Sequence, residues 1–135
     1  MKDKHSILVV DDEKNIAETV VWILQAAGYT ARPAYDGSAA LALSREQTPD
    51  LIISDVLMPG INGIELAITA SIEYPRCRIL LFSGQAGSAD MLDEARRHGH
   101  DFELLAKPIE PEDLVKKVAD VLASAQQDDT PTRAT

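Results

Sequence analysis

The chain has 135 residues, of which 45% are hydrophobic and 26% charged, and its 22 acidic and 13 basic side chains give a formal net charge of −9. This composition is typical of one folded domain, and the negative charge argues against direct binding to nucleic acid, which is also negative. Every apolar run falls short of the roughly 18 residues of a membrane span, which predicts a cytoplasmic protein without membrane contact.

Short apolar segments alternate with helical patterns along the chain. Strands are expected at about 6–10, 29–34, 51–55, 78–82 and 102–106, and helices at about 13–27, 36–47, 62–73, 88–98 and 111–123. This alternation predicts an α/β fold in which a five-stranded parallel sheet has helices on both faces. The domain is expected to span residues 1–123, followed by a disordered tail at 124–135 that has no apolar period.

Polar residues follow four of these strands at their carboxyl ends: Asp11 with Asp12, Asp55, Ser83 with Gly84, and Lys107. Carboxyl ends of parallel strands meet at one edge of a sheet, where such sheets bind ligands. Three neighbouring carboxylates repel one another, and an Mg²⁺ ion would relieve that repulsion while leaving coordination positions for phosphate oxygens. Lys107 and Ser83 can bind a phosphoryl group, which the Gly84 N–H can also approach. The set predicts phosphoryl transfer with Asp55 as acceptor.

With these residues in this order, the chain from about Ser6 to Ala123 resembles a response-regulator receiver domain of two-component signalling. The resemblance implies a flavodoxin-like fold with strand order 2-1-3-4-5. It also implies a magnesium site made by Asp12 directly, Asp11 largely through water, Asp55, and the backbone carbonyl of Leu57.

The resemblance further implies what the site does. Asp55 would take a phosphoryl group from the phosphohistidine of a sensor histidine kinase or of a histidine phosphotransfer protein. Lys107, before a Pro108 whose peptide bond is usually cis in this family, would bind a phosphoryl oxygen, and Ser83 would be the switch hydroxyl. Such a protein catalyses only its own phosphorylation and slow dephosphorylation. It would act by binding a downstream protein, and a stand-alone receiver without an output domain is expected.

Two positions depart from the family pattern. Leu104 replaces the usual Tyr or Phe of the switch, so the mechanism of that half of the switch is left open. Leu57 replaces a residue that is often polar and that steers the hydrolytic water. We therefore expect slow loss of the phosphoryl group unless Gln85 supplies the missing hydrogen bond.

Trp22 falls on the polar face of the first predicted helix, together with Asn15 and Glu18. Successive residues of a helix are 100° apart, which places Trp22 roughly opposite the apolar residues Val20 and Ile23. An exposed aromatic residue often marks a contact surface. Because the first helix is a main kinase-docking surface in the family, Trp22 is predicted to anchor the cognate kinase or another partner. A homodimer through the face of the fourth and fifth helices is the other contact left open.

Two other protein classes share parts of this pattern. An aspartyl-phosphate phosphatase or phosphotransferase of haloacid-dehalogenase type carries a second acid two residues after the nucleophile, where this chain has Leu57. A flavodoxin-like FMN carrier needs a hydroxyl-rich phosphate loop after the first strand, where this chain has Asp11 and Asp12. The receiver interpretation is therefore preferred to both.

Overall fold

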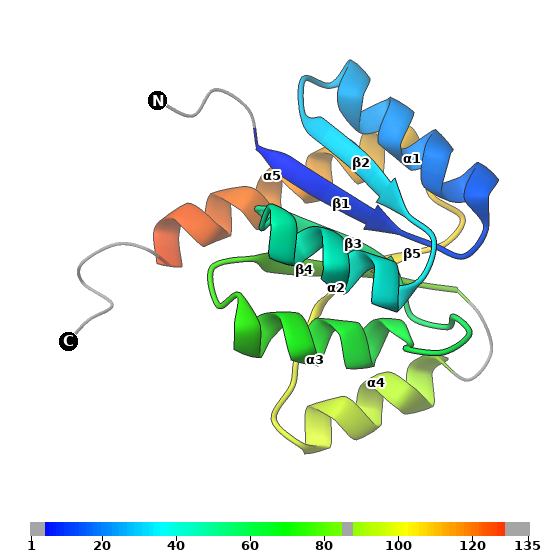
Figure 1. Cartoon of the computed structure of the whole chain (residues 1–135), viewed down its shortest axis with the longest axis vertical. Helices are drawn as coiled ribbons and strands as arrows, with labels where there is room; N and C mark the ends of the chain where they lie inside the picture. The colour runs from blue at the N-terminus through cyan, green and yellow to red at the C-terminus, as the bar shows by residue number, and fades with distance from the viewer. Residues whose placement is uncertain (1–4, 85–87, 129–135) are drawn as a thin grey trace.

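The computed structural model describes residues 5–84 and 88–128, with only the backbone described for 124–128. Strands and helices alternate throughout: β1 (Ser6–Val10), α1 (Lys14–Ala26), β2 (Thr30–Ala34), α2 (Gly37–Glu46), β3 (Leu51–Asp55), α3 (Gly63–Glu73), β4 (Arg78–Ser83), α4 (Ser88–Arg97), β5 (Glu103–Ala106) and α5 (Pro111–Asp128). The five strands form one parallel sheet in the order β2-β1-β3-β4-β5, as predicted (Figure 1).

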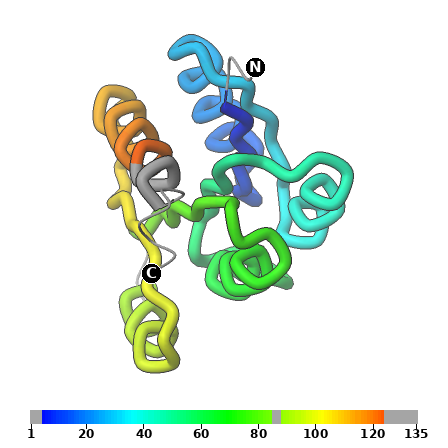
Figure 2. Tube along the Cα trace, turned by 90° about the vertical axis from the view of Figure 1, so that its left-hand side faces the viewer, coloured from blue at the N-terminus to red at the C-terminus, as the bar shows by residue number. Residues whose placement is uncertain are grey.

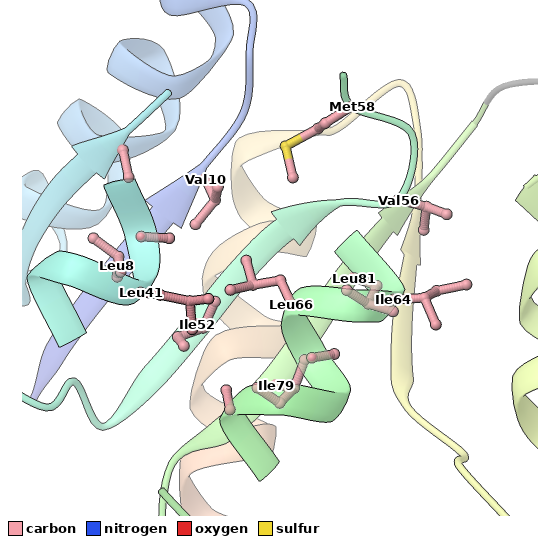
Figure 3. Close-up of a cluster of buried hydrophobic side chains, with 14 of the residues drawn as sticks. Leu8, Val10, Leu41, Ile52, Val56, Met58, Ile64, Leu66, Ile79 and Leu81 are labelled. Carbon is pink, nitrogen blue, oxygen red and sulfur yellow. The ribbon is translucent and has the colours of Figure 1, made fainter. Parts of the chain in front are cut away.

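The sheet separates two layers of helices (Figure 2). On one face, side chains from the central strands pack against α1 and α5, with Leu24 and Val118 fully buried. On the other face, Leu41 of α2 and Leu66 of α3 meet Ile52 of β3 (Figure 3). Residues of β1 and β3 are buried throughout because these strands lie inside the sheet and both faces are covered. The core thus holds the central strand ends in fixed register.

Helix caps position the loops at the carboxyl edge of the sheet. The Asp36 carboxylate accepts the Ala39 N–H at 2.7 Å at the start of α2. Asn62 and Glu65 form a capping box at the start of α3, with both hydrogen bonds at 2.9 Å. Each cap satisfies N–H groups that the first turn of a helix leaves without partners.

The last helix ends later than the predicted domain boundary at residue 123. Helix α5 continues to Asp128, so residues 124–128, which the sequence assigned to a disordered tail, are helical. Polar residues such as Gln126 and Gln127 lack an apolar period but are acceptable in a helix, and no Gly or Pro interrupts them. Residues 129–135 of that predicted tail lie outside the described part of the chain. No helix within the described ranges is long and apolar enough to cross a membrane.

Candidate functional site

Asp11 begins the loop that follows β1, and its carboxylate is almost completely buried, with 1% of the residue exposed. One carboxylate oxygen, Oδ1, accepts the Glu13 N–H at 3.0 Å. The other, Oδ2, is buried without a hydrogen-bond partner. Burial raises the pKa of the Asp11 carboxyl, and the nearby carboxylates of Asp55 and Asp12 act in the same direction, whereas the Glu13 N–H and the Lys107 charge lower it. Asp11 therefore holds an unsatisfied acceptor oxygen beside two further acids.

Asp11, Asp12 and Asp55 meet as the sequence predicted. Each of the three residues has a carboxylate oxygen that lies within 4.8 Å of a carboxylate oxygen of the other two. Asp12 is exposed, while Asp11 and Asp55 are buried. The geometry fits a hard divalent cation because it offers several carboxylate oxygens, one of them unpartnered, on a site open at Asp12. The residues present thus suit Mg²⁺.

Lys107 reaches this cluster from the loop after β5. Its Nζ lies 3.2 Å from Asp55 Oδ2 and 3.6 Å from Asp11 Oδ2. The Lys107–Pro108 peptide bond is cis, as the family resemblance implied. Lys107 therefore supplies a positive charge beside the predicted acceptor, in the place where a phosphoryl group on Asp55 would lie.

Two glycines keep the backbone and side chains of this site close together. A Cβ on Gly84 would lie 2.6 Å from Lys107 Cβ, so only glycine leaves room for the lysine stem. A Cβ on Gly63, the first residue of α3, would collide with the Asp55 carbonyl oxygen. The sequence pattern indicated Gly84 for anion approach but did not indicate Gly63, because close approach between distant segments leaves no local sequence signal.

Ser83 ends β4 and points to a partner that the sequence did not identify as part of the site. Its Oγ lies 3.0 Å from the Oγ of Ser88, the first residue of α4. Ser88 is 3% exposed, whereas Ser83 is partly exposed, so the pair joins a buried hydroxyl to one that water can reach. The contact links the strand end that faces Asp55 to the start of a helix, and the only available sequence signal was a second serine five residues on.

The sequence pattern of one family covers most of the chain: the response regulator receiver domain model matches residues 7–119. The chain belongs to the response regulator receiver family. The receiver is 32% identical over 117 residues to the probable transcriptional regulatory protein TcrX of Mycobacterium tuberculosis, covering 87% of this chain and 49% of that protein. It is 34% identical over 113 residues to the nitrogen assimilation regulatory protein NtrX of Azorhizobium caulinodans, covering 82% of this chain and 24% of that protein. It thus spans about half the length of such relatives, or less.

The fold of the chain is also similar to that of solved response-regulator structures. The receiver matches the chemotaxis protein CheY4 of Vibrio cholerae with a TM-score of 0.78 and 34% identity, covering 88% of this chain and 99% of that one. It matches NtrX of Brucella abortus with a TM-score of 0.82 and 27% identity, covering 93% of this chain and 28% of that one. The predicted family and strand order are therefore confirmed.

The two departures from the family pattern lie in the apolar part of the receiver. Leu104 is half-buried and packs, with Phe102, against the core on the α2 and α3 face. Leu57 is half-buried against the same core, two residues after Asp55. Its predicted role as a carbonyl ligand stays a prediction. Gln85 lies outside the described residues.

The predicted contact residues lie on the outside of α1. Trp22 is 69% exposed, which confirms its expected exposure, and Asn15 and Glu18 are exposed as well. The Glu18 carboxylate accepts a hydrogen bond from the Tyr35 hydroxyl at 2.9 Å. Asn15 lines a groove of about 360 Å³ that α1 forms with the Lys107–Pro108 turn. This groove places part of α1 next to Lys107.

Proposed function

We propose that this receiver accepts a phosphoryl group on Asp55 from the phosphohistidine of a sensor histidine kinase or histidine phosphotransfer protein. The observation that supports this most strongly is the pairing of Asp55 with Lys107 at 3.2 Å, inside a cluster of three carboxylates at the sheet edge. An acceptor carboxylate, a cation for the phosphoryl oxygens and oxygen ligands for a metal are the parts that phosphoryl transfer requires.

The proposed reaction forms one bond and breaks one. An Asp55 carboxylate oxygen attacks the phosphorus of the phosphohistidine, the P–N bond breaks, and its electron pair stays on the imidazole nitrogen of the donor. The product is an acyl phosphate on Asp55. Lys107 then pairs with a phosphoryl oxygen in place of the Asp55 carboxylate it now contacts. A magnesium ion held by Asp11, Asp12 and Asp55, with the Leu57 carbonyl, would supply further positive charge to the phosphoryl group.

The proposed switch uses the Ser83 hydroxyl. Ser83 bonds to Ser88 in the structure described here, and a phosphoryl group on Asp55 offers it a charged acceptor instead. When Ser83 turns to that acceptor, the start of α4 loses its hydroxyl partner at β4. Because Leu104 has no polar group, the motion that follows depends on apolar repacking, and the altered α4 region is then available to a downstream protein.

We also propose that Trp22 contacts the kinase, with Asn15 and Glu18 beside it. A kinase that delivers phosphohistidine to Asp55 has to approach the carboxyl edge of the sheet, and the α1 groove extends to Lys107 at that edge. The exposed indole of Trp22 offers a large apolar contact area. A homodimer through the α4 and α5 face stays a prediction.

The deciding experiment is intact-mass analysis after incubation with acetyl phosphate. The wild-type receiver should gain one phosphoryl mass in Mg²⁺ and none in excess chelator. Asp55→Asn should gain none, while the matched control Asp101→Asn, an exposed acid outside the site, should behave as wild type. A phosphoryl group that persists in Asp55→Asn would exclude the proposed acceptor.

The haloacid-dehalogenase-type alternative gives a different result in the same samples. Such an enzyme releases phosphate from a small phosphate ester over many turnovers, whereas a receiver stops at one acyl phosphate for each chain. Leu57 provides no second acid for turnover, so we expect no continuous release of nitrophenol from p-nitrophenyl phosphate.

A further inference from the structure

Helices α3 and α4 enclose an apolar groove away from the phosphorylation site. Its volume is about 640 Å³, and its apolar walls are Ile64 and Ile68 of α3 and Met91 and Ala95 of α4. Helix α4 lies beyond α3, at the opposite end of the molecule from α1 (Figures 1 and 2). The groove therefore lies far from the proposed kinase contact at Trp22.

The apolar surface of the groove continues along α3 into solvent. Ile72 follows Ile68 by four residues, so its side chain lies one turn further along the same stripe. Ile72 is 71% exposed, and only Trp22 joins it as a large exposed apolar side chain among the described residues. The stripe from Ile64 to Ile72 is about 12 Å long, roughly two helical turns. Ile64 is buried, Ile68 is half-buried and Ile72 is exposed, so the stripe opens to solvent at its Ile72 end, where apolar surface is available for another protein to cover.

The edge of this groove is acidic. Glu65 of α3 and Asp90 and Glu94 of α4 line it, together with the imidazoles of His98 and His100, and no Lys or Arg is among its described lining residues. Arg97 lies 3.5 Å from Glu94, and because both side chains are about two-thirds exposed this ion pair is weak and leaves Glu94 able to exchange it for another basic partner. Arg96 pairs with Asp93 and Asp101, outside the groove. An occupant with basic groups beside an apolar face would match this charge.

We propose that the groove between α3 and α4 binds an amphipathic helix of a partner protein that has basic residues beside its apolar face. A third helix fits because Ile64, Ile68 and Ile72 are spaced by four residues, and an apolar strip between two helices matches the i, i+4 face of another. The acidic edge selects the basic partner and accelerates its association. Binding at this groove is independent of Asp55 and therefore goes beyond the proposed phosphoryl transfer.

The probe for this proposal is a labelled synthetic helical peptide of about 14 residues, with Leu at i, i+4 and i+8 and Lys on the flanks. Its affinity for the full chain is measured by fluorescence anisotropy at low and high salt. A second peptide has Glu in place of every Lys. We expect the lysine peptide to bind at least about tenfold more tightly than the glutamate peptide, and its binding to weaken with salt. Equal affinity of the two peptides, or no binding of the lysine peptide, would overturn the proposal.

Variants of the receiver locate the binding site. Asp90→Lys and Ile72→Ser each alter an exposed side chain, so both should fold as the wild type does, and each should weaken peptide binding severalfold or more. Trp22→Ala on α1 and Asp120→Lys on α5 are the matched apolar and charge controls, and they should leave the affinity unchanged. If the controls weaken binding as much as the groove variants do, the peptide is held by net charge or by another face, and the assignment is wrong.

Discussion

The two faces of the sheet are covered differently. Among the residues whose side chains are described, α1 and α5 each bury four apolar side chains in the core: Ala17, Val20, Val21 and Leu24 in α1, and Leu114, Val118, Val121 and Leu122 in α5. On the other face, α4 buries only Leu92 and Ala95 as apolar residues and borders an open groove. Each face also exposes one large apolar residue, Trp22 and Ile72. The helices on one face are therefore firmly packed, whereas the other face includes a helix, α4, that buries few apolar side chains.

Paired core truncations test this difference most severely. Leu24→Ala in α1 should lower the free energy of unfolding by about 3 to 4 kcal/mol, because a fully buried leucine leaves a cavity in a tightly packed core. Leu92→Ala in α4 should cost about 2 kcal/mol or less, because its surroundings can move into the space. Urea denaturation of both variants measures the two values. Equal losses would show that α4 is packed as firmly as α1.

The Ser83–Ser88 hydroxyl pair connects the proposed phosphorylation site to helix α4. Ser88→Ala removes the partner that competes with a phosphoryl group for Ser83. A neutral hydrogen bond contributes about 1 kcal/mol, so affinity for the phosphoryl analogue beryllofluoride in Mg²⁺ should rise by about fivefold. The same substitution in a Ser83→Ala background should have no effect. An unchanged affinity in the single variant would mean that Ser88 does not hold Ser83.

The two exposed apolar residues allow a matched comparison of function with little effect on stability. Trp22→Ala and Ile72→Ala should each change the free energy of unfolding by less than about 0.5 kcal/mol, because each side chain is mostly in solvent. Only Trp22→Ala should slow phosphotransfer from the cognate kinase, by about tenfold or more if it is an anchor. If phosphotransfer is equally fast in wild type and in Trp22→Ala, Trp22 does not anchor the kinase on α1.

A change at Cys77 tests whether side chains on the α3 face are loosely packed only beside the α3–α4 groove, and its expected effect is small. Cys77 belongs to the core of that face, and burial raises the pKa of its thiol to about 12. The neutral thiol is favoured in the folded state, so its contribution to stability is complete below the ordinary thiol pKa and declines as the pH rises toward about 12.

The stability difference between wild type and Cys77→Ala should therefore be constant from pH 7 to pH 8 and shrink by less than about 1 kcal/mol by pH 9.5. Urea denaturation at each pH measures it. Native Cys77 should also react slowly with iodoacetamide at pH 8 and rapidly in urea. Rapid alkylation of the native protein would show that the packing around Cys77, near the end of α3, is loose as well.

The sequence predicted the sheet edge well because its evidence was local. Each apolar run ended in a polar residue, and parallel strands necessarily bring such ends together, so Asp11, Asp55 and Lys107 could be placed beside one another. The exposure of Trp22 followed from helical periodicity alone. The Ser83–Ser88 contact and the α3–α4 groove were missed because they depend on how one helix packs against distant segments. The end of α5 was misplaced because polar residues do not terminate a helix by themselves.

The close approach of Gly63 to the backbone of Asp55 has a consequence for genetics. Any side chain at position 63 would push on the Asp55 carbonyl oxygen and so displace the carboxylate of this proposed acceptor from Lys107. Gly60, three residues before Gly63, has open space where a Cβ would lie, although its φ of +73° still disfavours other residues. A screen for signalling-defective alleles should therefore recover Gly63 substitutions, although this residue carries no charge, hydroxyl or ligand atom in its side chain.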